Sequence, residues 1–207
     1  MVLAAPRRRR ADRRRTILEA ALACFARVGF AATTMADIRR EARASIGSIY
    51  HHYNGKEQLA AALFVEGLRD YQQSLLAEMK RVQSGRGVAR RSVAAIVGHY
   101  LRWVAAHPDW ARYLLEMGQS PFVAEMRDEV ERMNRQFFGE LKERLQAHVD
   151  AGELARLPLS LQLAILVGPA RDFARQWLRG AEVDIKQAGR VLAEAAWKSL
   201  RTKTRKG

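Results

Sequence analysis

Hydrophobic residues recur along this chain every three or four positions, and the strict alternation that marks a β-strand is absent. Between residues 13 and about 28, the apolar positions follow the i, i+3/i+4, i+7 spacing of an amphipathic helix. Gly29 follows as a C′ residue, because glycine reaches the left-handed conformation at little cost. The pattern predicts an all-α fold, and the first helix is expected to bury Ile17, Ala20, Ala21, Cys24, Phe25 and Val28.

Two short helices follow, each opened by an N-cap residue. Thr34 can cap the first, and Asp37 three positions later can complete a capping box. Ser45 can cap the second, which we expect to run to about Tyr53, before Asn54-Gly55 breaks the chain. Longer helices fill the rest of the chain at about 56–82, 88–107, 109–117, 121–150, 159–179 and 184–202, and Pro169 is expected to kink the helix that contains it.

The net charge of +14 is concentrated at the two ends of the chain. Residues 1–56 hold 12 basic and 4 acidic side chains, and residues 198–207 hold 5 basic and none acidic, whereas residues 57–197 hold 19 and 18. We therefore expect an anionic partner, nucleic acid or a membrane surface, to meet the ends. No apolar run approaches the ~18 residues of a membrane span. A single cysteine fits a reducing compartment, so we expect a soluble, cytoplasmic protein.

The three N-terminal helices have the layout of a helix-turn-helix, in which the last helix enters the major groove and the one before it crosses the phosphate backbone. Short residues in the stretch 45–53 permit close approach to bases, and its hydroxyl, imidazole and phenol groups can donate to phosphates or read base edges. We expect Ile49 in the core, whereas Ile46 either touches a thymine methyl group or is simply exposed. Lys56, at the start of the long helix, is interpreted as a phosphate clamp, with a solvated turn lysine as the alternative.

These same residues resemble the TetR family of bacterial transcriptional regulators. The resemblance covers about residues 13–60 and rests on Gly29-Phe30 and on the stretches TTMADI at 33–38, SIGSIYHHY at 45–53 and KEQL at 56–59. It implies that Gly47, Ser48 and Ile46 lie near base edges and that Tyr53 locks the recognition helix into its domain. It also implies DNA contacts, mostly to phosphates, by Thr34, Ser45, Tyr50, His51, His52 and Lys56.

The sequence departs from the family in the turn before the recognition helix, where the family usually has glycine and this chain has Arg43. An arginine held at positive φ costs about 1 kcal/mol. Either the turn differs from that of the family, or Arg43 gains a contact with a phosphate. We therefore include Arg43 among the candidate DNA-binding residues.

The expected domain organisation has four parts. A disordered basic leader (1–12) precedes the helix-turn-helix DNA-binding domain (13–60), and a helical ligand-binding and dimerisation domain (61–202) precedes a basic tail (203–207). The leader is hypothesised to reach into an adjacent minor groove. The last two helices are apolar on more than one face, which means either burial within one subunit or a homodimer seam; the resemblance implies the dimer.

The central helices are rich in aromatic and sulfur-containing side chains, which suit an apolar ligand pocket as well as an ordinary core. By resemblance, we expect a pocket for a hydrophobic or aromatic small molecule, whose binding favours a spacing of the two recognition helices that does not fit DNA. The candidate ligand-binding residues are Tyr100, Trp103, Trp110, Tyr113, Met117, Phe122, Met126, Phe137, Phe173 and Trp177.

Enzymatic chemistry finds no support in the sequence. His51 and His52 are neighbours on a helix and point about 100° apart, so they cannot chelate one metal ion, and we expect neither a metal nor a cofactor. The expected function is a homodimeric, ligand-responsive repressor of a palindromic double-stranded operator. The alternatives are a basic protein that coats nucleic acid without sequence preference and a small-molecule sequestering protein with a vestigial DNA domain.

Overall fold

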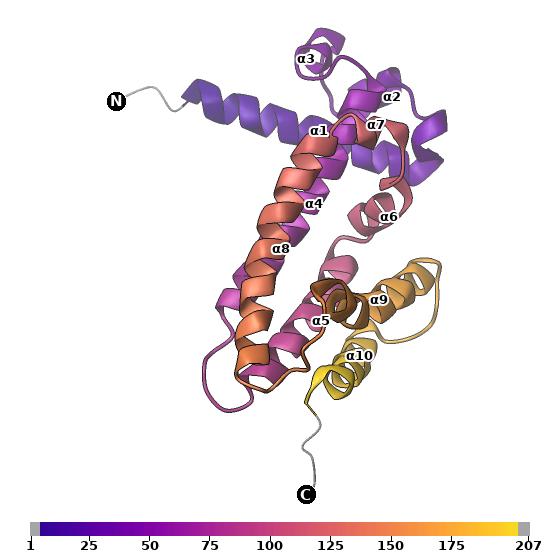
Figure 1. Ribbon diagram of the computed structural model, residues 1–207. Helices are drawn as coiled ribbons and strands as arrows, with labels where there is room; N and C mark the ends of the chain where they lie inside the picture. The colour runs from indigo at the N-terminus through magenta and orange to yellow at the C-terminus, as the bar shows by residue number, and fades with distance from the viewer. Residues whose placement is uncertain (1–4, 203–207) are drawn as a thin grey trace, which may run out of the picture. The chain divides into compact units, whose positions relative to one another are not determined.

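The computed structural model describes residues 5–202, with side chains from residue 12 onward, and it confirms the all-α fold (Figure 1). The described residues form two compact units: unit 1 holds residues 5–68 and 109–130, and unit 2 holds residues 69–108 and 131–202. The helices are α1 (Ala5–Ala32), α2 (Met35–Glu41), α3 (Ile46–Tyr50), α4 (Lys56–Lys80), α5 (Val88–Ala106), α6 (Pro108–Met117), α7 (Pro121–Ala124), α8 (Arg127–Asp150), α9 (Leu159–Leu178) and α10 (Ile185–Leu200).

The first helix is longer at its N-terminus than the sequence pattern predicted. It begins at Ala5, inside the segment expected to be a disordered leader, and Figure 1 shows its first turns extending beyond the other helices of unit 1. Proline is tolerated in a first helical turn, and alanine and arginine are strong helix formers, so residues 5–12 favour helix. The rest of the leader, residues 1–4, and the basic tail, residues 203–207, lie outside the described residues.

The core of unit 1 forms around the apolar face of α1. Ile17, Ala21 and Cys24 on that face are fully buried. Val28 was wrongly placed on it, because its side chain is 51% exposed. The backbone leaves helical geometry at Gly29 (φ 81°, ψ 163°), and the following Phe30 packs on Phe25 with ring centroids 5.4 Å apart. Phe30 therefore takes the place in the core that was expected for Val28.

Helices α6 and α7 belong to unit 1, although the predicted domain ended at residue 60. The Tyr113 ring stacks on Phe25 at 5.8 Å, and its hydroxyl donates to the Ala60 carbonyl at 2.8 Å. Phe122 packs against Phe30 at 4.8 Å. These aromatic contacts bury a distant segment of the chain against α1 and α4, which a reading of local periodicity does not reveal.

One predicted helix, 121–150, is two helices in the structure. The short helix α7 ends at Ala124, and α8 begins at Arg127. Between them the Met126 amide bonds to the Val123 carbonyl at 3.0 Å, the i to i−3 pattern of a tight turn. The break lets Phe122 and Val123 be buried in the unit 1 core.

Unit 2 is built from the later part of α4, α5, most of α8, and α9 and α10. Helix α5 packs against both α9 and α10, and α9 continues through Pro169, where we expected a kink. The loop after α8 joins the end of α10 through the Ala155 amide, which donates to the Leu200 carbonyl at 2.7 Å. None of the helices in the described range is both long and apolar enough to cross a membrane.

Candidate nucleic-acid interface

Helix α2 is fixed at its start by the predicted capping box. The Asp37 amide donates to Thr34 Oγ1 at 3.2 Å, and the Thr34 amide donates to the Asp37 carboxylate at 3.0 Å. Hydrogen bonds from Thr34 hold the pKa of the Asp37 carboxyl below its usual value. Thr34 is exposed, so its hydroxyl lies at the surface while it serves the helix.

Helix α3 is anchored from its buried side. The Ser48 amide donates to Ser45 Oγ at 3.1 Å, which confirms Ser45 as the N-cap. Ile49 is fully buried, and Tyr53 just after the helix is almost so. The Tyr53 hydroxyl accepts a hydrogen bond from Arg14 Nε at 3.1 Å, which joins the recognition stretch to α1. Burial of Ile49 and Tyr53 fixes which side of α3 faces outward.

The outward side of α3 carries the residues expected to meet DNA. Ile46 and Tyr50 are 45% and 48% exposed, unusually open for large apolar or aromatic groups, and His51 is exposed beside them. A methyl group built at Gly47 would meet no atom within 4 Å, so the backbone there is open to close approach. The structure thus brings these residues to one face, with Ser48 and His52 half-buried at its border.

The turn before α3 keeps a strained backbone at Arg43. Its φ of 46° makes it the one non-glycine residue with positive φ in the described part of the chain. Arg43 is exposed, and no hydrogen bond or ion pair holds its side chain within the described residues. The turn has therefore kept the left-handed geometry that glycine would favour, with a free guanidinium at the edge of the exposed face.

Replacing Arg43 with glycine should raise the free energy of unfolding by about 0.5–1 kcal/mol relative to an Arg43→Ala protein, because alanine remains strained at positive φ. Both variants remove the same positive charge, so they share any electrostatic effect. Urea unfolding curves of the two proteins measure the difference. If alanine were the more stable replacement, the turn in solution would not hold the left-handed geometry.

Lys56 differs from the phosphate clamp that the sequence suggested. Its ammonium group is half-buried and donates to three backbone carbonyls, those of Phe30 at 2.9 Å, Ala31 at 3.2 Å and Thr33 at 2.9 Å. It also lies 4.5 Å from the centre of the Phe30 ring. All three donors are used inside unit 1, so the geometry favours a role in joining the start of α4 to the end of α1.

Two arginines of α2 are further candidates for contacts with the DNA phosphate backbone, and the sequence pattern did not single them out. Arg39 and Arg40 are exposed next to the buried Ile38, and Arg40 pairs with Asp37 whereas Arg39 has no partner among the described residues. Helix α2 is the element that crosses the phosphate backbone in a helix-turn-helix. The buried position of Ile38 in the helical pattern could have placed both arginines on the outer side.

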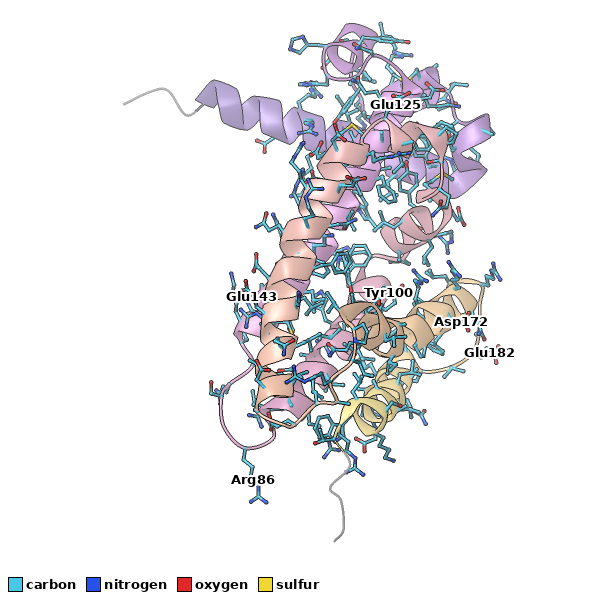
Figure 2. All side chains as sticks on the ribbon, viewed as in Figure 1. Arg86, Tyr100, Glu125, Glu143, Asp172 and Glu182 are labelled. Carbon is cyan, nitrogen blue, oxygen red and sulfur yellow. The ribbon has the colours of Figure 1, made fainter. Side chains whose placement is uncertain are left out.

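Three of the predicted ligand-binding residues meet in unit 2 around a tyrosine that the sequence analysis missed. The Tyr71 ring of α4 has ring neighbours on α5 and α8, at 5.8 Å for Tyr100, 5.5 Å for Trp103 and 6.4 Å for Phe137. Figure 2 labels Tyr100, which belongs to this group and lies on α5. Trp103 Nε1 donates to the Asp70 carboxylate at 2.8 Å. This Tyr71 cluster is apolar with a few fixed polar groups, a composition that ligand sites share with ordinary cores.

Further polar groups surround the Tyr71 cluster. His99 Nε2 lies 3.0 Å from Ser74 Oγ, and the Gln72 side chain donates to Asn134 at 2.8 Å. Burial lowers the pKa of His99 and raises that of Tyr71, and it raises the pKa of Tyr100 to about 12. All three side chains are therefore neutral near pH 7, which suits an uncharged part of a ligand.

The other predicted ligand-binding residues do not join the Tyr71 cluster. Phe173 and Trp177 are half-buried on α9, and no ring contact links them to Tyr71 within the described residues. The remaining five pack in the core of unit 1, because α6 and α7 fold against α1 and α4; they are Trp110, Tyr113, Met117, Phe122 and Met126.

The N-terminal part of the chain matches a family model described as bacterial regulatory proteins of the tetR family, over residues 17–63. The chain is also 33% identical over 131 residues to the HTH-type transcriptional repressor KstR2 of Mycolicibacterium smegmatis, a match of 59% of this chain and 62% of that protein. KstR2 of Mycobacterium tuberculosis is 31% identical over 129 residues. The match thus spans less than two thirds of these relatives' length.

Solved structures share the fold over almost the whole chain. A TetR family transcription regulator from Marinobacter aquaeolei VT8 superposes with a TM-score of 0.79 at 22% identity, covering 95% of this chain and all of that one. The regulator FadR of Bacillus subtilis, in complex with stearoyl-CoA, superposes with a TM-score of 0.74 at 19% identity, covering 88% and 96%. At these identities the likeness shows the fold alone.

Proposed function

Because this chain belongs to the TetR family of bacterial regulatory proteins, we propose that it is a homodimeric transcriptional repressor that binds a palindromic DNA operator and is released by a small molecule. The observation that carries this proposal is the outward face of α3, where Ile46, Gly47 and Tyr50 are open to solvent on a capped and anchored helix. An exposed isoleucine and tyrosine on such a short helix have no use in the fold itself. They suit contact with the floor of a major groove.

Around this face the basic groups are placed for phosphates. Arg39 on α2 and Arg43 in the turn are exposed and carry no partner among the described residues. Such contacts supply affinity for any DNA, and the α3 face would supply preference for a sequence. With DNA as its partner, the protein would act in the cytoplasm.

A dimer would double the recognition surface across a two-fold axis, as palindromic half-sites require. The candidate seam is the outer side of α9 and α10, where Leu161 and Val191 are 51% and 61% exposed. Ala164 and Ala195 are exposed near them and are small enough for close helix packing. Large apolar groups this open on a single chain suit burial against a second copy.

Replacing Val191 with glutamate should turn the dimer into a monomer, because a charge would be buried without a partner at the seam. The matched control is Val28→Glu, which changes a valine of similar exposure on α1. Analytical ultracentrifugation at micromolar concentration measures the mass of each protein. A Val191→Glu protein that stays dimeric would place the seam elsewhere.

The proposed effector is hydrophobic or aromatic, and the Tyr71 cluster is its candidate site. FadR of Bacillus subtilis, which shares the fold, was solved with stearoyl-CoA, a long apolar chain on a polar carrier. We therefore infer that a molecule with a large apolar part releases this protein from its operator by favouring a conformation that does not fit DNA. Stearoyl-CoA is a suitable first probe in a DNA-release assay.

The decisive experiment is capture of fragmented DNA from the source organism at about physiological salt, where non-specific binding is weak. We expect enrichment of one or a few palindromic sites. Uniform retention would favour the protein that coats nucleic acid without preference. Tight binding of small molecules without any retained DNA would favour the sequestering protein.

Tyr50→Ala should then weaken operator binding by roughly 30-fold, since a dimer loses one contact of about 1 kcal/mol in each half-site. Phe138→Ala is the control, because Phe138 is an exposed aromatic residue of α8 in unit 2. Fluorescence anisotropy with the captured operator measures both affinities. Equal affinities would remove Tyr50 from the interface.

A further inference from the structure

A groove runs between α5 and α10 in unit 2 and is distinct from the Tyr71 cluster and from the proposed dimer seam. Its volume is about 610 Å³, in the range of small-molecule sites. Gly189 and Leu101 both line it and lie close together, since a methyl group added at Gly189 would lie 3.7 Å from Leu101 Cδ1. The floor is made of small and apolar side chains, including Ala94, Gly98, Ala105, Ala106, Ile185 and Ala193.

Three basic residues line this apolar groove. Lys186 and Arg190 are one helical turn apart on α10, both exposed, and their side chains have no hydrogen bond or ion pair within the described residues. Arg102 on α5 is held by Glu78 at 3.0 Å. The acids that α10 carries nearby are engaged, since Asp184 caps the helix and Glu194 pairs with Arg90. Among the residues that line the groove, all those that carry a charge are basic.

The groove is separate from the proposed effector site and the proposed dimer seam. On α5, Gly98 and Ala105 lie roughly opposite the side that carries Tyr100 and Trp103, at about 100° per residue. On α10, Gly189 and Val191 are two positions apart and therefore also lie on nearly opposite sides, about 200° apart around the helix. An occupant of the groove would leave both of the other surfaces accessible.

We propose that this groove binds a free, unbranched amphiphile with one anionic head group, such as a fatty carboxylate. From Ala94 to Ala106 the α5 wall is about 18 Å long at 1.5 Å per residue, enough for an alkyl chain of about a dozen carbons. The alkyl chain lies on the alanine and glycine floor, and Leu101 and Ile185 in the same lining add apolar contact. The head group pairs with Lys186 and Arg190, which a neutral or cationic ligand would leave unused.

Isothermal titration calorimetry with monomeric dodecanoate tests this site. We expect the affinity to fall about tenfold in a Lys186→Gln/Arg190→Gln protein, as for two partly exposed ionic contacts. An Arg132→Gln/Lys142→Gln protein loses the same charge from α8, where both residues are exposed, and should bind as the unaltered protein does. Dodecyltrimethylammonium, with the same chain and the opposite charge, should bind at least about tenfold more weakly.

A second variant tests whether the alkyl chain of dodecanoate binds in the groove. Ala105→Phe fills the groove from an exposed position and should abolish dodecanoate binding while leaving the unfolding midpoint unchanged. Undiminished binding to this variant would overturn the proposal, as would equal weakening by the α8 control. Binding to anionic phospholipid vesicles without binding of monomeric dodecanoate would also overturn it. Because no DNA is used, the outcome is independent of the proposed repressor function.

Discussion

Replacing Lys56 with methionine should lower the free energy of unfolding by about 2 kcal/mol, because one change removes three charge-assisted hydrogen bonds and a cation–π contact. The carbonyls of Phe30, Ala31 and Thr33 follow the bend at Gly29, at or just beyond the end of α1, and need partners outside that helix. Lys56 is half-buried, so water would replace part of what is lost. Urea unfolding measures the change, and Lys142→Met on the exposed side of α8 should leave stability within about 0.5 kcal/mol.

The same variant separates a positioning role for Lys56 from direct contact with a phosphate. Thr33 precedes the N-cap of α2, so a loosened Lys56 junction would shift α2 and α3 and weaken operator binding. In that case the slope of log K against log salt should stay unchanged. A phosphate contact would instead reduce the slope by about one for each lysine removed. A reduced slope with an unchanged free energy of unfolding would support the interpretation of Lys56 as a phosphate clamp.

Periodicity and capping residues predicted most of the helices, because those signals act within a few residues of the chain. Thr34 with Asp37, and Ser45 with Ser48, form the local hydrogen bonds that their spacing indicated. The burial of Ile49 was predicted in the same way, since its position on a short amphipathic helix places it on the side that faces the core. The exposed face of α3 follows directly from that burial.

Long-range packing explains what the sequence did not predict. Tyr113 and Phe122 suited a ligand pocket by residue type, yet they lie against Phe25 and Phe30 on a segment more than 80 residues away. Lys56 stood at a helix N-terminus, where an anion is favoured, but the end of α1 supplies two carbonyls, those of Phe30 and Ala31, and Thr33 just after it supplies a third. Tyr71 was overlooked because its ring neighbours come from α5 and α8.

Replacing Gly67 with alanine should lower the free energy of unfolding by about 2–3 kcal/mol, the usual cost of forcing a methyl group into a filled space. A methyl group built there would lie 2.6 Å from Cζ3 of Trp110 and closer still to Cε3. Trp110 is partly buried in the unit 1 core, and the opposing atoms belong to its rigid ring. Helix propensity alone would give the opposite sign, since alanine is favoured over glycine inside a helix by about 0.5–1 kcal/mol.

Gly139 provides the matched control for this change, because it is a helical glycine of α8 around which an added methyl group meets no atom within 4 Å. Gly139→Ala should therefore raise the free energy of unfolding by about 0.5–1 kcal/mol, while Gly67→Ala lowers it. In a Trp110→Leu background the cost of Gly67→Ala should largely disappear, because the ring atoms that obstruct the methyl group are gone. An unchanged cost in that double variant would mean that Trp110 is not what excludes a side chain at Gly67. The strain would then lie in the backbone of α4, and α6 would owe its place in unit 1 to Tyr113 and its hydrogen bond to Ala60.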